Sequence, residues 1–213
     1  MNRRRTAVIA LAACTAVAAL SGCSAQTAHP GAAAVVGDQR IAVSTLQADV
    51  AAYRTAVSQD TSASEGASVS SQTLQLLVLA QLVQQTLAAE GGSVTEGQVQ
   101  QAEASAAAQQ GSAQALSQAF VEQLSLAPSD MDVFYRMQLG ELDLLEKAGV
   151  NPSSSGESAA LVKLLSAAAG RLNVQVNPRY GVWSDAKLTL GAPGAPWLKA
   201  VPSAPASAAP AGS

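Results

Sequence analysis

The sequence predicts a mainly α-helical domain that begins with a short β-hairpin, continues through about six helices and is closed by a C-terminal strand. Three observations support this prediction. Small and β-branched residues flank a glycine at position 37, apolar residues recur at helical spacing between residues 46 and 165, and a short strand-like run ends at Val176. Aromatic residues make up only 3% of the chain, so we expect a modest core of Leu, Val and Ala.

The first predicted element is the hairpin. Residues 34–36 and 40–43 are two short apolar or β-branched segments, and they surround the tight-turn sequence 37–39. A glycine at the centre of such a pattern is typical of a hairpin turn. We therefore expect the folded domain to begin here.

A helix is predicted directly after the hairpin. Ser44 and Gln47 have the spacing of a capping box, which indicates a helix start at Ser44 and an end at Ser58 or Asp60. The apolar positions of this helix recur at intervals of four, three and four residues and share one face. They are Leu46, Val50, Tyr53 and Val57.

Residues 70–90 predict the central core helix. Leucine and valine cover most of its circumference, which is typical of a helix buried by several neighbours or of a membrane span. Five glutamines interrupt the segment, so no run of about 18 apolar residues exists and we favour the buried helix. Gly91 and Gly92 are expected to end it with a left-handed cap.

Three more helices are predicted before residue 148. The first starts at residues 94–96 and runs to about Gln110, and its polar, alanine-rich sequence indicates an exposed helix. A break at residues 111–112 separates it from a short helix over 114–124, with Leu116, Phe120 and Leu124 on one face. The third is expected over 130–147, with Ser129 as its N-cap.

The last predicted elements close the domain. Residues 149–158 form a linker, residues 157–170 a helix with Leu161, Leu164 and Leu165, and residues 172–176 a strand. We expect residues 173–176 to pair with the initial hairpin. The predicted domain therefore spans residues 33–190, and residues 191–213, rich in Gly, Ala, Pro and Ser, are predicted to be a disordered tail in which Trp197 is the one large side chain.

The N-terminus has the organisation of a secretory leader. Three arginines at positions 3–5 precede the apolar segment 6–20, which is too short to span a bilayer comfortably. The sequence Leu20-Ser21-Gly22-Cys23 resembles the lipobox of bacterial lipoproteins. That resemblance implies cleavage between Gly22 and Cys23, so that residues 1–22 are a signal peptide and residues 23–32 a tether.

Lipidation of Cys23 is the further implication of the lipobox. In such lipoproteins the cysteine sulfur carries a diacylglyceryl group, and two acyl chains give stable anchoring where one gives only marginal binding. The alternative is an ordinary secretory signal with a coincidental cysteine. The sequence leaves the export route, general or twin-arginine, open.

Composition excludes several classes of function. After residue 22 the chain keeps nine basic and fifteen acidic residues, a net charge of about −6, so we expect no nucleic-acid partner. Cys14 leaves with the leader and Cys23 carries lipid, so no cysteine is left for a disulfide, a zinc site or a nucleophile. The single histidine, His29, lies in the tether. We therefore expect no metal, no cofactor and no histidine-based catalysis.

The order of these elements resembles the SurA-like N-terminal domain of extracytoplasmic foldases. The resemblance rests on "AVVGDQRI" followed by a capped helix, "GGSVTEGQV" opening another helix, "LSLAPSDMDVFYRMQL" opening a later one, and "VNPRYG" after the returning strand. It covers residues 33–148 and the returning helix and strand. The chain departs from the family pattern at Val36, where the asparagine of the usual Asn-Gly turn is missing, which leaves the turn type open.

The resemblance implies chaperone-type binding of unfolded polypeptide. Family members with isomerase activity carry a parvulin domain at the position of linker 149–158, and this chain has neither that segment nor its residues, so we expect no enzyme. Candidate peptide-binding side chains are Tyr53, Phe134, Tyr135 and Met137. The alternative for each is core packing, which helical spacing favours.

The acidic residues between 130 and 146 could indicate acid catalysis or calcium binding. They are Asp130, Asp132, Glu141, Asp143 and Glu146. No loop brings three of them together at ligand spacing, so we interpret them as a solvated face.

Together these features predict a lipid-anchored, extracytoplasmic protein on the outer face of the cell membrane. We expect it to act as a non-enzymatic holdase whose partners are unfolded or nascent exported polypeptides. The alternative is a structural or adaptor lipoprotein that binds one dedicated envelope partner. The high usage of alanine, glycine and valine indicates a GC-rich genome, such as that of an actinobacterium.

Overall fold

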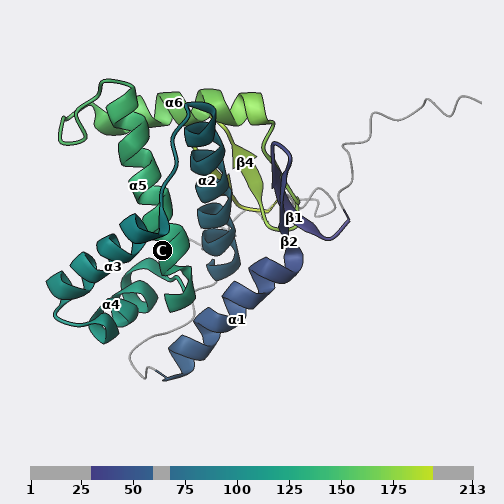
Figure 1. Ribbon diagram of the computed structural model, residues 1–213. Helices are drawn as coiled ribbons and strands as arrows, with labels where there is room; N and C mark the ends of the chain where they lie inside the picture. Colours follow the sequence, from purple (N-terminus) through teal and green to yellow (C-terminus); the bar gives the residue numbers. More distant parts are fainter. Residues whose placement is uncertain (1–29, 60–67, 194–213) are drawn as a thin grey trace, which may run out of the picture. The chain divides into compact units, whose positions relative to one another are not determined.

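The computed structural model describes residues 30–59 and 68–193 (Figure 1). The predictions for residues 1–22, Cys23 and Trp197 lie outside these ranges.

The predicted fold class is confirmed: helices dominate, a hairpin comes first, and small strands come last. The helices are α1 (Val43–Gln59), α2 (Val69–Ala89), α3 (Glu96–Gln110), α4 (Ala113–Ala119), the π-helix η1 (Phe120–Leu124), the 3₁₀ turn η2 (Pro128–Asp130), α5 (Met131–Lys147) and α6 (Glu157–Leu172). The strands are β1 (Ala32–Val36), β2 (Gln39–Ala42), β3 (Gln175–Val176), β4 (Val182–Ser184) and β5 (Thr189–Gly191).

The first three strands form a sheet in the order β2-β1-β3. All five residues of β1 are buried, including Ala32, which the sequence had placed in the tether. Gly37 has a φ of +60° at the first turn position while Asp38 has no positive φ, which is the pattern of a type II′ turn. The hairpin prediction is confirmed, and the missing asparagine is explained because this turn needs glycine only at its first position.

Closure of the sheet by a returning strand is also confirmed. β3 pairs antiparallel with β1, with Val176 opposite Ala34. The strand is shorter than the predicted 172–176 because α6 continues to Leu172 and ends at Asn173, whose φ of +49° is left-handed. The pairing brings residue 176 beside residue 34 and so joins the two ends of the domain.

Helix α1 begins one residue earlier than predicted. The chain passes from β2 directly into Val43, so Ser44 lies inside the helix and the predicted cap is wrong. The N–H of Val43 donates to the carbonyl oxygen of Gly31 at 2.9 Å, which gives one of the first helical N–H groups a backbone partner. The predicted apolar face is confirmed, since Leu46, Val50 and Tyr53 are buried and Val57 packs against the core.

Helix α2 is the central core helix, as predicted. It packs against α1, α5, α6 and β1 (Figure 1). Two of its glutamines bind backbone groups: Gln85 donates to the carbonyl oxygen of Val36, and Gln75 accepts from the N–H of Leu190. Within residues 30–59 and 68–193, no helix combines the length and apolarity that a bilayer crossing requires.

The end of α2 confirms the glycine cap. Gly91 has a φ of +69° and its N–H donates to the carbonyl oxygen of Ala88 at 3.0 Å. The N–H of Gly92 donates to the carbonyl oxygen of Leu87 at 2.9 Å. These two bonds are those of a Schellman motif, which satisfies carbonyls that the helix end would otherwise leave without partners.

The helix predicted over 114–124 is split. α4 ends at Ala119, and the chain continues as a π-helix through Leu124 to Ser125, whose φ is +53°. Leu116 and Phe120 are buried as predicted, but Leu124 is 40% exposed. The wider π turn rotates Leu124 off the buried face, so the prediction for this residue is wrong.

The start of α5 also differs from the prediction. Pro128 begins a 3₁₀ turn, and α5 starts at Met131, so Ser129 is not the N-cap. The carboxylate of Asp130 instead accepts a hydrogen bond from the N–H of Ala127 at 3.1 Å. Asp130 therefore folds back over the turn and is buried rather than solvated.

A second hairpin, β4–β5, was not predicted. It follows the turn at residues 177–180, in which the N–H of Tyr180 donates to the carbonyl oxygen of Asn177 at 2.9 Å. Gly181 lies so close to the carbonyl oxygen of Gly191 that a Cβ would collide with it. The ordered strands thus reach Gly191, the residue at which the predicted tail begins.

Candidate functional site

The four candidate peptide-binding side chains do not form one open surface. Tyr53 is 2% exposed and Met137 is 9% exposed, and both belong to the hydrophobic core. Phe134 and Tyr135 are partly buried and pack against that core. The structure thus places Tyr53 and Met137 where the packing alternative expects them.

Phe134 and Tyr135 belong to an aromatic cluster with Phe120. Phe134 meets Phe120 edge-on with ring centroids 5.1 Å apart, and Tyr135 meets Phe134 edge-on at 5.4 Å. Such edge-to-face pairs stabilise packing beyond the area they bury. The cluster therefore attaches η1 to α5, and this contact accounts for both candidate residues without a ligand.

Among the carboxylates interpreted as a solvated face, Asp130 is buried and Glu141 is half-buried. Asp130 is 3% exposed, and burial, followed by the nearby charge of Asp49 on α1, raises its pKa to about 6. Burial also raises the pKa of Glu141 to about 7. The interpretation is therefore wrong for Asp130, whose burial depends on tertiary contacts that helical spacing does not reveal. Among the residues that the structure describes, no cluster of three or more potential metal ligands is found.

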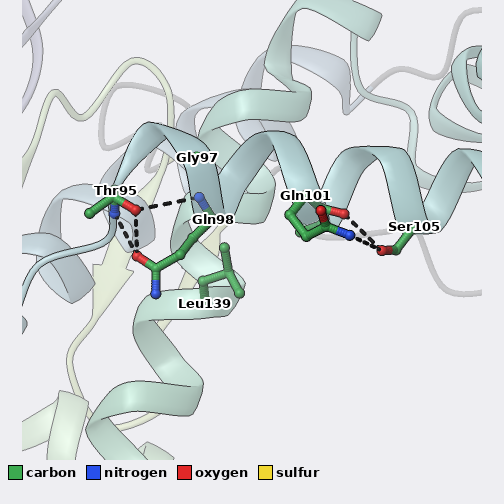
Figure 2. Close-up of a pocket in the computed structure, with 7 residues that line it drawn as sticks. Thr95, Gly97, Gln98, Gln101, Ser105 and Leu139 are labelled. Carbon is green, nitrogen blue, oxygen red and sulfur yellow. Dashed lines mark hydrogen bonds between the residues drawn. The ribbon is translucent and has the colours of Figure 1, made fainter.

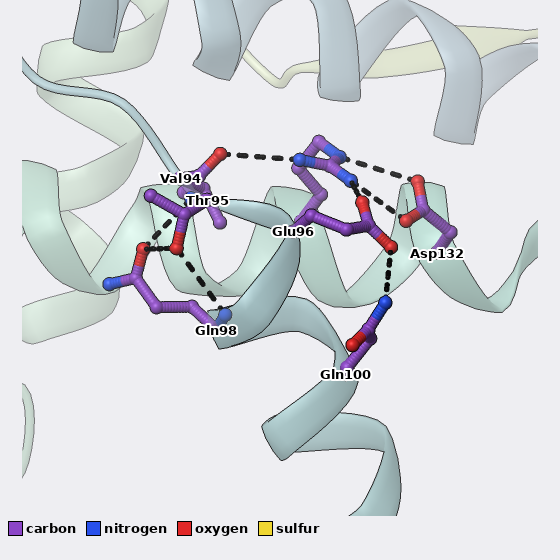
Figure 3. Close-up of polar contacts among 7 residues, drawn as sticks. Val94, Thr95, Glu96, Gln98, Gln100 and Asp132 are labelled. Carbon is purple, nitrogen blue, oxygen red and sulfur yellow. Dashed lines mark hydrogen bonds and ion pairs between the residues drawn. The ribbon is translucent and has the colours of Figure 1, made fainter.

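Arg136 fixes the start of α3 onto α5. Figure 3 labels its three partners, Val94, Glu96 and Asp132. Its Nη2 lies 2.6 Å from the carboxylate of Glu96 and 2.8 Å from that of Asp132, and its Nη1 donates to the carbonyl oxygen of Val94 at 3.2 Å. The hydrogen bond to Asp132 and then that to Glu96 raise the pKa of Arg136 against the effect of burial. The guanidinium of Arg136 is therefore bound by groups of the chain itself, two carboxylates and one carbonyl oxygen.

A capping box orients the first turn of α3. The N–H and the hydroxyl of Thr95 each donate to Oε1 of Gln98 at 2.8 Å, and the N–H of Gln98 donates to the Thr95 hydroxyl oxygen at 3.4 Å (Figure 2). Reciprocal bonds of this kind hold both side chains in one arrangement. The side-chain NH₂ of Gln98 takes no part in them.

An open groove of about 500 Å³ lies beside α3, where it passes Leu139 of α5. It is lined by Thr95, Gly97, Gln98, Gln101, Ala102, Ser105 and Leu139. Figure 2 shows Gln98, Gln101 and Ser105 along one side of α3, with Leu139 across from Gln98. No charged side chain lines the groove. The sequence pattern did not identify it, because a polar, alanine-rich helix carries no hydrophobic signal.

The face of α5 that carries Leu139 continues beyond the groove lining. Leu142 and Glu146 lie three and seven residues later, so all three residues share one face of the helix. Leu142 is 47% exposed and Glu146 is exposed. This face therefore presents an apolar strip that ends in a carboxylate.

A smaller cavity of about 200 Å³ lies between α2, the α2–α3 connection and α5. Val83, Leu87 and Val94 provide apolar walls, and Arg136 and Gly140 are also part of the lining. A Cβ on Gly140 would stand 2.6 Å from Cγ1 of Val83, so α2 and α5 are in close contact here. The size of the cavity suits one side chain rather than a length of polypeptide.

Comparison with known proteins identifies no relative: no family model, no curated protein and no solved structure matches this chain.

Proposed function

We propose that this chain is a lipid-anchored extracytoplasmic protein that holds unfolded exported polypeptides without catalysing a reaction on them. The observation that carries the proposal is the open groove between α3 and α5, lined by amide, hydroxyl and apolar groups. The lipobox at residues 20–23 supports the anchored location.

The chemistry of the lining suits a polypeptide main chain. An extended backbone presents N–H donors and C=O acceptors, and the side chains of glutamine and serine each offer both kinds of group. Gln101 and Ser105 are exposed; the Ser105 hydroxyl donates to the carbonyl oxygen of Gln101 at 2.8 Å, and it accepts a long hydrogen bond of 3.4 Å from Nε2 of Gln101. A ligand can replace the long bond at little cost, so the Gln101 amide and the acceptor side of the Ser105 hydroxyl can adapt to many sequences.

Apolar contact comes from the α5 side of the groove. Leu139 is part of the lining, and Leu142 remains 47% exposed on the same helix face. Burying such side chains against a client contributes about 25 cal/mol per Å² of apolar surface. Because the groove is open and without a deep pocket, we expect weak binding of many sequences rather than tight capture of one.

The resemblance to the SurA-like N-terminal domain points the same way. It rests on the order of the sequence motifs at residues 34–41, 91–99, 124–139 and 176–181. We take the chaperone role of that family as support for a binding function, and we expect no acceleration of prolyl bond rotation by this chain.

Suppression of aggregation tests the proposal. The full chain, purified in detergent, is mixed with several unrelated denatured proteins, and light scattering follows their aggregation on dilution. Because binding to any one sequence is expected to be weak, we expect suppression of each client at a molar excess of the chain. Suppression of none, or capture of a single envelope protein only, would contradict the holdase and, in the second case, support an adaptor.

A blocked groove provides the matched variant. Ser105→Trp places a large side chain in the groove, whereas Ser158→Trp places the same side chain at an exposed serine of α6. We expect the first variant to lose suppression and the second to retain it, with equal thermal stability of the two. Equal suppression by both variants would show that clients are held elsewhere.

A further inference from the structure

The charges of the described chain are unevenly distributed, and this distribution bears on what the groove between α3 and α5 accepts. Residues 94–148, which contain α3, α4 and α5, carry eight carboxylates and two cations. Residues 149–193 carry two carboxylates and four cations. Two of the eight, Asp130 and Glu141, have pKa values raised to about 6 and about 7, so the helices that form the groove carry a moderate net negative charge at neutral pH, while the C-terminal part is weakly basic.

The cations among these helices do little to offset the carboxylates around the groove. Arg136 is paired with Glu96 and Asp132, and it lines the smaller cavity rather than the groove. Lys147 lies in the last turn of α5, directly after Glu146. Because the groove lining itself is uncharged, the net negative charge of the helices that form it sets the sign of the potential there.

Apolar and acidic groups follow one another along the face of α5 that starts at the groove with Leu139. Leu139 lies in the groove, Leu142 is 47% exposed one turn further on, and Glu146 follows on the same face. A segment lying along this face would place an apolar side chain against the leucines and then meet the carboxylate. A lysine or arginine suits this position, since its aliphatic stem can cover apolar surface while its charged end reaches a carboxylate.

We infer that this groove selects extended polypeptide segments in which lysine or arginine alternates with apolar residues. The inference rests on the proposed function and adds a charge preference to it. Acidic segments are repelled by the same field, so discrimination comes from repulsion as well as attraction. Solvent-exposed charges are screened beyond about 10 Å at 0.1 M salt, so the preference weakens as salt increases.

Fluorescence anisotropy with three matched peptides tests the inference. The labelled peptides are four repeats of Gly-Leu-Ser-Lys, Gly-Leu-Ser-Gln or Gly-Leu-Ser-Glu, and each is titrated with the full chain in detergent at 50 mM and at 500 mM NaCl. At low salt we expect the lysine peptide to bind about tenfold more tightly than the glutamate peptide, with the glutamine peptide between them. At high salt we expect the difference to shrink to about twofold.

Two surface variants and one control locate the effect. Glu146→Gln should weaken binding of the lysine peptide and leave the glutamine peptide unchanged, whereas Leu142→Ser should weaken both. Asp38→Asn, in the exposed β1–β2 turn, removes one negative charge elsewhere and should change neither. All three side chains are exposed, so each variant is expected to fold.

The outcomes separate this inference from the proposed function. Equal affinity for the three peptides, together with suppression of client aggregation, would overturn the charge preference and leave the holdase intact. A lysine preference without suppression of aggregation would support the groove and overturn the holdase. If Asp38→Asn weakens binding of the lysine peptide as much as Glu146→Gln does, the assignment to this groove is overturned. The net charge of the chain alone would then explain the lysine preference.

Discussion

Nε2 of Gln85, on the central helix α2, donates a 2.7 Å hydrogen bond to the carbonyl oxygen of Val36 at the end of β1. The bond joins the core helix to the hairpin across 49 positions of sequence. Gly37 allows this approach, since a Cβ at that position would stand 2.6 Å from Oε1 of Gln85. The glutamines of α2 indicate in the sequence that the helix does not span a membrane. In the fold, two of them bind α2 to the neighbouring strands by hydrogen bonds.

Removal of this connector should destabilise the domain. Gln85→Ala deletes the donor to Val36, a fully buried residue, and we expect a loss of about 1–2 kcal/mol in the free energy of unfolding. Urea denaturation followed by circular dichroism measures it. Gln72→Ala, at an exposed position of the same helix, should change stability by less than about 0.5 kcal/mol. Equal effects of the two changes would show that the bond contributes nothing.

Close packing of α2 and α5 predicts opposite effects for two Gly→Ala changes. In Gly140→Ala the new methyl group would stand 2.6 Å from Cγ1 of Val83, and we expect destabilisation by about 1–3 kcal/mol. In Gly97→Ala nothing lies within 4 Å of the new Cβ, and helix propensity should stabilise α3 by about 0.5 kcal/mol. Thermal melts of the two variants against the parent chain check both signs. A stabilised Gly140→Ala variant would contradict the close contact.

The buried carboxylates predict greater stability at mildly acid pH. Burial raises the pKa of Glu141 to about 7 and that of Asp130 to about 6, both above their values in an unfolded chain. The folded state therefore binds more protons than the unfolded state between about pH 7 and pH 4, so the free energy of unfolding increases as the pH falls through this window. We expect a gain on the order of 2 kcal/mol between pH 8 and pH 5, measured by urea denaturation.

Neutral variants identify the groups responsible for this pH dependence. Glu141→Gln and Asp130→Asn remove the buried charge, so each should flatten the increase and stabilise the chain at pH 8. Asp38→Asn, at an exposed turn, should keep the slope of the parent chain. A parent chain that is most stable at pH 8 would contradict the raised pKa values of these two carboxyl groups.

Acylation at Cys23 is tested by metabolic labelling with a radioactive fatty acid in a bacterial host. We expect the chain to be labelled and to fractionate with membranes, and Cys23→Ala to lose both properties. Cys14→Ala is the matched control, because that cysteine lies in the predicted leader and its loss should leave labelling unchanged. Label that persists in Cys23→Ala would contradict the lipobox assignment.

Much of the fold can be predicted from the sequence, because the local turn and helix patterns are consistent with the pairing of β3 with β1 that closes the sheet. The glycine turn at residue 37 and the Gly91-Gly92 cap act through their own backbone angles, so nearby residues are sufficient to predict them. The pairing of β3 with β1 could be anticipated because a short β-branched run returns directly after a helix. The π turn at residues 120–124 and the β4–β5 hairpin could not, because neither has a distinctive period and the hairpin turns at Leu188, a non-glycine residue with a φ of +54°.

The candidate site was harder to predict for a physical reason. Large aromatic and methionine side chains are candidates for peptide binding in a sequence, but Tyr53 and Met137 pack inside this small core. The groove is formed by Gln98, Gln101 and Ser105, whose residue types are common on any solvent-exposed helix. The contact of α3 with α5, held at the start of α3 by Arg136, adds Leu139 to these residues and so forms the groove.

Photo-crosslinking tests most directly whether the groove holds unfolded polypeptide. A benzophenone amino acid is placed at Gln101 in the groove or at Asp38 in the β1–β2 turn of the full chain, which is then irradiated with a denatured client, and the crosslinks are mapped by mass spectrometry. We expect Gln101 to crosslink to several unrelated clients at many positions and Asp38 to none. Absence of crosslinks from Gln101 under conditions in which aggregation is suppressed would contradict a polypeptide-holding role for the groove.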